Sequence, residues 1–272
     1  METTKLNNTG ERMLVDQYQS SIEDYVIYLM HIASYDFAEA FVGGKRVLDY
    51  GCGSGYGAAR MAATAATVDA VDVAEDAIAE AQAEFRDSNL RFQAIRADAP
   101  LPFADGSFDT VLSFQVVEHV RDVPCYLSEI RRLLAPDGVA LLITPNRDNR
   151  LLSWQRPWNR WHVTEYNTAS LTKALAPFFP TVEIQQMSGR LEVMEVELRR
   201  YRKLKWITLP FTLPIIPDSA RLALLNGLHA LRGRSRETAA RRKFDFDVSA
   251  IQIGPGLKPS LNLVAIARPS VS

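Results

Sequence analysis

Glycine occupies every second position after a short apolar run in residues 47–57, VLDYGCGSGYG. The apolar run predicts a buried parallel strand, and the alanine-rich residues 58–63 predict the helix that follows it. Between the two elements, glycine permits a tight turn and lets backbone N–H groups approach a ligand closely. A pyrophosphate-binding turn has the spacing G-x-G-x-x-G, whereas this one has D-x-G-x-G-x-G, with Asp49 at the strand end. That carboxylate favours a cationic ligand; a glycine-rich loop that binds nothing is the alternative.

Strand and helix patterns alternate after this loop. Apolar strand segments at 67–73, 90–97, 110–114 and 139–144 are separated by helical segments and short turns. This alternation predicts an α/β fold with a doubly wound, mostly parallel sheet, in which we expect seven strands. Helical apolar spacing over residues 18–42 predicts a helix ahead of the first strand, over the mouth of the crevice.

Polar residues mark the ends of successive predicted strands. Asp72 ends the second strand, Asp98 follows the third, and residues 115–119 (QVVEH) continue the fourth. Ligands and catalytic groups gather at the carboxyl ends of the strands in an open parallel sheet. An acid at the end of the second strand suits ribose hydroxyls, which donate to both of its oxygens. For Asp72, the alternative is a solvated turn acid.

The order of these motifs resembles class I S-adenosylmethionine-dependent methyltransferases over roughly residues 40–190. The resemblance implies a Rossmann-like fold, S-adenosylmethionine as cofactor and S-adenosylhomocysteine as product. It implies that Asp72 binds the ribose, that Asp98 and Ala99 recognise adenine, and that the Gln115 carbonyl meets the methionine amine. The cofactor-binding residues that it implies are Asp49, Gly51, Cys52, Gly53, Tyr56, Asp72, Val73, Asp98, Ala99 and Gln115.

A narrower resemblance concerns the acceptor. The stretches TGERM (9–13), HIASYDFA (31–38), HVTEY (162–166) and FDFDV (244–248) are similar to bacterial methyltransferases encoded among glycan-assembly enzymes. This resemblance implies methylation of a hydroxyl of a sugar, glycan or glycosylated small molecule. The alternative is a lipid or quinone-like acceptor whose apolar tail lies in the Pro-rich segment 207–217. An RNA-type N-P-P-Y run does not follow the fourth strand, so no nucleic-acid partner is expected.

Methyl transfer to a sugar hydroxyl needs a base with a pKa near neutrality. We predict His119 as this base, with Glu118 orienting it, because both follow the strand end beside the cofactor. His162, in the long aromatic loop 147–167, is the second candidate, and we expect it to face the substrate. A structural role remains the alternative for each histidine. Aromatic residues of the loop either stack on a sugar ring or hold the loop in place.

The run QVVEH is similar to the E-x-x-E-H run of ubiquinone-pathway O-methyltransferases, which can hold a divalent metal. Gln115 replaces the first acid. A site that loses one of three ligands binds a hard dication poorly, so we predict no metal.

We interpret the chain as one methyltransferase domain with an N-terminal cap (1–42), a cofactor-binding core (43–189), a basic and apolar insertion (190–243) and the final strands (244–272). The insertion holds thirteen Lys and Arg against five Asp and Glu, whereas the whole chain has a net charge of −1. Such a segment suits a membrane surface or a phosphate, or is simply a solvated basic face. No apolar run or leader pattern suggests membrane insertion or export, so we expect a cytoplasmic protein. A homodimer is left open.

Overall fold

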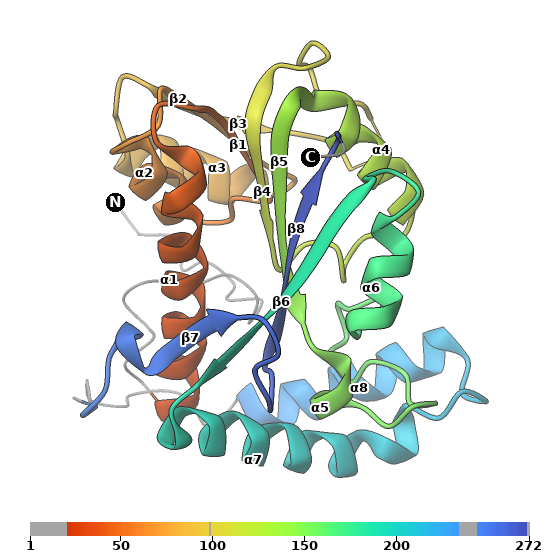
Figure 1. The fold of residues 1–272 in the computed structure, drawn as a ribbon. Helices are drawn as coiled ribbons and strands as arrows, with labels where there is room; N and C mark the ends of the chain where they lie inside the picture. The colour runs from red at the N-terminus through yellow and green to blue at the C-terminus, as the bar shows by residue number, and fades with distance from the viewer. Residues whose placement is uncertain (1–20, 98, 234–243, 271–272) are drawn as a thin grey trace, which may run out of the picture.

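A computed structural model describes residues 21–97, 99–233 and 244–270. Its centre is an eight-stranded sheet with the order β3-β2-β1-β4-β5-β8-β6-β7 (Figure 1). The first five strands run parallel: β1 (Arg46–Tyr50), β2 (Thr67–Asp72), β3 (Leu90–Ala94), β4 (Phe108–Phe114) and β5 (Leu134–Pro145). β8 (Asn262–Arg268) is antiparallel to both β5 and β6 (Thr181–Gly189). The predicted doubly wound, mostly parallel sheet is confirmed.

The sheet has eight strands against the seven expected, and β7 (Ile251–Gly254) forms its edge antiparallel to β6. The alternating aromatics of 244–248 do not extend this strand. Tyr25 stacks on Phe244 with ring centroids 4.7 Å apart and donates to the Phe246 carbonyl at 2.8 Å. Asp247 then caps the 3₁₀ turn η2 (Val248–Ala250). The alternation therefore serves packing on a helix and not pairing in the sheet.

Helices cover both faces of the sheet (Figure 1). One face packs against α1 (Ile22–Val42), α2 (Tyr56–Ala62), α3 (Glu75–Glu84) and α7 (Leu191–Thr208). The other face packs against α4 (Val123–Leu133) and α6 (Thr168–Leu175). The switch of helices from one face to the other occurs between β1 and β4, which places a crevice at the carboxyl ends of these strands.

α1 begins where Ser21 accepts a hydrogen bond from the Asp24 N–H at 3.0 Å, and acidic residues occupy its first turn. Its buried residues recur at helical spacing, as in Val26, Leu29, Met30 and Ala33. This buried side continues to Tyr35, so the helix presents a tyrosine to the glycine-rich residues 51–57, here called the glycine loop. The sequence predicted this helix correctly, from about the same start.

The insertion 190–243, here called the basic segment, consists in its described part of α7, the 3₁₀ turn η1 (Leu209–Phe211) and α8 (Asp218–Gly233). α7 packs against α1 and against the short α5 (Arg147–Arg150). Residues 9–13, Asp98 and residues 234–243 of the predicted motifs lie outside the described residues. Among the helices that are described, none combines the length and apolarity needed to cross a membrane.

Candidate active site

The glycine loop is tight on one side and open on another. Gly51 has a φ of +91°, and a side chain there would collide with Val116 of the turn after β4. Gly53 has a φ of +54°, and a Cβ built on it would meet no atom within 4 Å. Glycine is therefore required at both positions, at one by close packing and at both by the left-handed backbone. The open side at Gly53 is where a ligand can reach the backbone.

Asp49 lies at the end of β1 with 1% of its surface exposed. The Tyr35 hydroxyl donates to its Oδ2 at 3.1 Å, and Tyr35 reaches it because Gly57 leaves room for the ring against α2. Burial raises the pKa of Asp49 from 3.8 to about 7; the bond from Tyr35 opposes this rise and the charge of Asp72 adds to it. Oδ1 is buried without a hydrogen-bond partner among the described residues. A cationic ligand group would satisfy it.

The carboxylate of Asp72 is held by two backbone donors. Gly53 N–H donates to Oδ2 and Ala74 N–H donates to Oδ1, both at 2.9 Å. A carboxylate has about four acceptor sites, so two hydrogen bonds leave capacity for ribose hydroxyls. The neighbouring Val73 is 58% exposed. Ala99 is exposed, and its N–H donates to the Arg96 carbonyl at 3.4 Å.

Two further residues of the loop have distinct environments. Burial, together with the charges of Asp49 and Asp72, raises the pKa of the Cys52 thiol, so it is a poor nucleophile at neutral pH. Tyr56 begins α2, and its hydroxyl is buried without a hydrogen-bond partner in the part of the chain described. Unpaired buried polar atoms on Asp49 and Tyr56, beside an open Gly53, fit a polar, positively charged ligand such as S-adenosylmethionine.

β4 ends in a strained turn. Gln115 has a φ of 58°, a conformation that is uncommon for a residue other than glycine, and its N–H donates to the Ile143 carbonyl at 2.7 Å. The turn directs Val116 onto Gly51 and then carries Glu118 and His119. Val116 therefore joins the glycine loop to the turn that carries the predicted catalytic residues.

Glu118 is completely buried. Thr144 donates to its Oε2 at 2.9 Å, whereas Oε1 has no hydrogen-bond partner within the described ranges. Burial raises its pKa to about 7, against the opposing influence of His119 and of its hydrogen bonds. The Glu118 carbonyl accepts from the N–H groups of Val163 at 2.8 Å and Thr164 at 3.2 Å. The aromatic loop is thus attached to the turn after β4.

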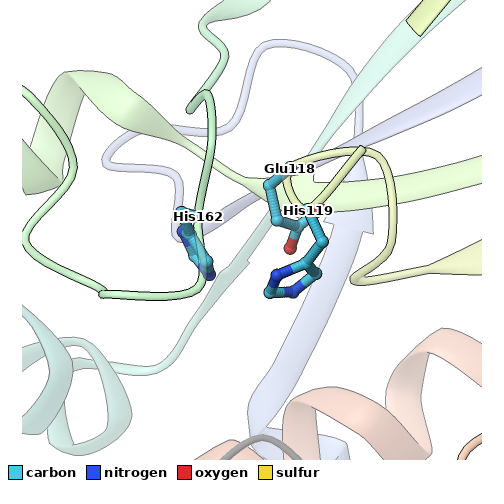
Figure 2. A group of neighbouring side chains, drawn as sticks. All are labelled: Glu118, His119 and His162. Atoms are coloured by element: carbon cyan, nitrogen blue, oxygen red, sulfur yellow. The ribbon is translucent and has the colours of Figure 1, made fainter. Parts of the chain in front are cut away.

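This attachment brings His162 beside His119, with ring centroids 4.9 Å apart in an edge arrangement. Figure 2 shows Glu118 and His119 on one segment and His162 on the segment facing it. The Nδ1 of His119 lies 3.1 Å from the Trp161 carbonyl, and the Nδ1 of His162 lies 2.8 Å from Glu165 Oε1. The structure therefore unites all three residues predicted to be catalytic.

Behind His162 lies a buried ion pair that the sequence analysis missed. Arg150 donates to Glu165 through Nε at 2.9 Å and Nη2 at 3.0 Å, and its guanidinium lies 4.2 Å from the centre of the Trp158 ring. Burial opposes ionisation of Glu165, but the charge of Arg150 and hydrogen bonds from His162 and Arg150 bring its pKa to about 2. Burial lowers the pKa of His162 to about 4. A neutral His162 therefore donates from Nδ1 to an ionised Glu165.

Some aromatic side chains of the loop 147–167 hold it in place, whereas another is exposed to solvent. Trp158 lies under Arg150, and Tyr166 is buried in the core, so both hold the loop in place. Trp161 is 45% exposed, with the Arg160 guanidinium 4.7 Å from its ring centre. The H-x-x-E spacing of His162 and Glu165 was visible in the sequence, but no local signal indicated Arg150.

Part of the chain is similar to known methyltransferases. Residues 48–142 match the family model described as "Methyltransferase domain". A probable S-adenosylmethionine-dependent methyltransferase of Mycolicibacterium smegmatis is 35% identical over 61% of this chain and 62% of its own length. A ubiquinone biosynthesis O-methyltransferase of Psychrobacter cryohalolentis is 36% identical over 41% of this chain and 45% of its own length. The chain thus spans less than two thirds of these relatives.

Solved structures share the fold. The YcgJ protein of Bacillus subtilis superposes with a TM-score of 0.55 at 18% identity, covering 89% of this chain and all of the other. The fold, the glycine loop and the family match together make residues 48–142 similar to S-adenosylmethionine-dependent methyltransferases.

Proposed function

We propose that the chain methylates a hydroxyl of its acceptor from S-adenosylmethionine. The observation that carries this proposal is the cluster of Glu118, His119 and His162, two of which follow Val116, the residue that packs on Gly51. Two imidazoles and a carboxylate beside the cofactor loop are groups that can receive a hydroxyl proton. A methyltransferase for a more nucleophilic atom has less need of them.

S-adenosylmethionine supplies a methyl group on a sulfonium, and its transfer forms the new O–C bond as the S–C bond breaks toward sulfur. Asp49 and Asp72 hold the cofactor at its charged and hydroxylated parts. His119 takes the proton from the acceptor oxygen, which a base does with a rate gain of about 10²–10⁴-fold. The strained turn at Gln115 holds His119 and the cofactor loop in one geometry, and such alignment lowers the barrier by several kcal/mol.

For the acceptor, we propose a sugar, glycan or glycosylated small molecule. The support is the half-exposed ring of Trp161, whose own carbonyl lies 3.1 Å from His119 Nδ1. The apolar C–H face of a sugar ring packs on an aromatic face, and polar atoms around the ring then contact the nearby charged groups. Arg160, stacked on Trp161, offers such a group.

A lipid or quinone-like acceptor is the second candidate. It is favoured by the similarity to ubiquinone biosynthesis O-methyltransferases and by apolar side chains exposed in the basic segment. Trp206 is 57% exposed, Ile207 40% and Ile215 84%. An apolar tail would cover these side chains while the ring hydroxyl reaches the cluster.

Incubation with methyl-labelled S-adenosylmethionine and separate glycan and lipid pools tests the two acceptors. Label in the glycan pool supports the first, and label in lipid alone rejects it in favour of the second. His119→Ala should lower turnover by about 10²–10⁴-fold while calorimetry still detects cofactor binding. Unchanged turnover in this variant would remove His119 from the role of base.

A further inference from the structure

We propose that Glu118, His119 and His162 form a binding site for a divalent transition-metal ion. Each residue offers one nitrogen or oxygen atom, and the three atoms lie within 4.8 Å of one another. Figure 2 shows the side chains grouped between the turn after β4 and the aromatic loop. Glu118 and His119 are neighbours in the sequence, in the turn after β4. The loop supplies the third.

Hydrogen bonds orient both imidazoles for metal binding. The Nδ1 of His162 faces the Glu165 carboxylate, and the Nδ1 of His119 faces the Trp161 carbonyl. An acceptor at Nδ1 places the ring proton there and leaves the lone pair on Nε2. Histidines that bind metals almost always make this second hydrogen bond to a carboxylate or a backbone carbonyl. For His162 the arrangement extends to Arg150, which fixes Glu165 by two hydrogen bonds.

Glu118 supplies the negative charge. It is fully buried, one of its oxygens accepts from Thr144, and the other has no hydrogen-bond partner in the described parts of the chain. A buried carboxylate oxygen without a partner is costly, and a cation beside it removes this cost. The orphaned oxygen and the two oriented histidines are independent observations that point to the same ligand.

The donor set selects the class of ion. Two imidazole nitrogens and one carboxylate oxygen suit Zn²⁺, Fe²⁺ or Co²⁺, whereas Mg²⁺ and Ca²⁺ prefer oxygen ligands alone. Metal–ligand distances of about 2.0–2.2 Å require the donor atoms to approach to about 3–3.5 Å. His119 is the partly exposed member of the three, so we expect it to move onto the ion while the two buried residues stay in place.

Three protein ligands leave coordination positions open. This consequence rests on the proposed function: an acceptor hydroxyl that binds at an open position loses its proton more readily, as water does on a catalytic zinc ion. With an ion bound, coordination would lower the pKa of the hydroxyl, its proton would pass to solvent water, and His119 would act as a ligand in place of the base role proposed above. Acceptors with two adjacent hydroxyls, which can chelate, should then be preferred.

Titration of the metal-depleted full chain with Co²⁺ tests the site. We expect one Co²⁺ per chain, with visible d–d absorption that Zn²⁺ displaces and Mg²⁺ does not. His119→Ala, at the more exposed ligand, should weaken Co²⁺ binding at least tenfold and alter the spectrum, and His162→Gln should do the same. His31→Gln, on α1 and outside the cluster, is the matched control and should bind as the wild type does. Circular dichroism verifies that each variant is folded.

Absence of stoichiometric Co²⁺ binding to the wild type, or equal binding by folded His119→Ala, refutes the site. Label transfer from S-adenosylmethionine is measured on the same preparations. Transfer without metal binding rejects the metal site and leaves the proposed function intact. Metal binding that depends on His119 without any transfer supports the site and rejects the proposed function.

Discussion

At the scale of single residues, the site depends on acids held away from water. Asp49 accepts a hydrogen bond from the Tyr35 hydroxyl, and burial, this bond and the charge of Asp72 shift its pKa, with no cationic side chain among these causes. Its carboxyl therefore retains a proton to about pH 7 in the free protein. A cofactor with a positive charge binds the ionised form better, and this couples affinity to pH.

The affinity for S-adenosylmethionine should rise by about tenfold between pH 6 and pH 8, because the pKa of Asp49 is raised to about 7 and its ionised fraction grows over this interval. Asp49→Asn should bind more weakly and show no such rise. Isothermal calorimetry at several pH values measures both, with the exposed Asp137→Asn as a control that keeps the wild-type profile. A flat profile for the wild type contradicts the assignment.

Gly57→Ala tests the packing that brings Tyr35 to Asp49. Alanine in a helix gains about 0.5–1 kcal/mol over glycine, but the added methyl would overlap the Tyr35 ring, and overpacking costs about 1–3 kcal/mol. The larger effect should win, so we expect a net loss of stability in urea unfolding and weaker cofactor binding. Gly43→Ala is the control, because a Cβ there meets nothing within 4 Å. Equal stability of the two variants would show that the ring is not confined.

At the scale of elements, the aromatic loop is held by charge as well as by apolar contact. Arg150 of α5 donates a hydrogen bond to Glu165. Its guanidinium lies 4.2 Å from the ring centre of Trp158 in the aromatic loop and 4.9 Å from the ring centre of Tyr201 in α7. The same Glu165 orients His162. A single buried arginine therefore connects α5, α7 and the loop that brings His162 to Glu118 and His119.

Arg150→Ala should destabilise the protein by about 3–5 kcal/mol, because it leaves the Glu165 carboxylate buried without its cation. The control is Arg46→Ala, which breaks the exposed pair with Asp109 and should cost no more than about 1 kcal/mol. Chemical denaturation measures both. Similar losses for the two variants would show that burial does not set the strength of the Arg150 pair.

At the scale of the whole molecule, positive charge is concentrated in one region. Residues 190–243 hold thirteen Lys and Arg against five Asp and Glu, whereas the whole chain has a net charge of −1. In the described part, α7 carries exposed Arg202 and Lys203 next to exposed Trp206 and Ile207. Basic and apolar side chains side by side suit an anionic membrane surface.

We expect the chain to bind vesicles that contain anionic lipid and to be released as salt rises. Reversing two charges with Arg202→Glu and Lys203→Glu should weaken binding at least about tenfold, since each basic residue near such a surface contributes about 1 kcal/mol. Lys45→Glu with Arg86→Glu, at exposed positions in the half of the sheet around β1 to β3, is the matched control. Vesicle sedimentation at low and moderate salt measures the effect. If both pairs weaken binding equally, the surface around α7 is not the contact.

The sequence by itself predicted the sheet, its crevice and a cationic ligand, because the D-x-G-x-G-x-G loop and the polar residues at strand ends are local patterns along the chain, and the resemblance to a family then implied the cofactor. It also indicated Glu118 and His119, which are neighbours in that order. Only the tertiary structure joined His162 to them and placed Arg150 behind it. That arrangement depends on two backbone hydrogen bonds to the Glu118 carbonyl and on a buried ion pair fifteen residues apart, and no local pattern encodes either.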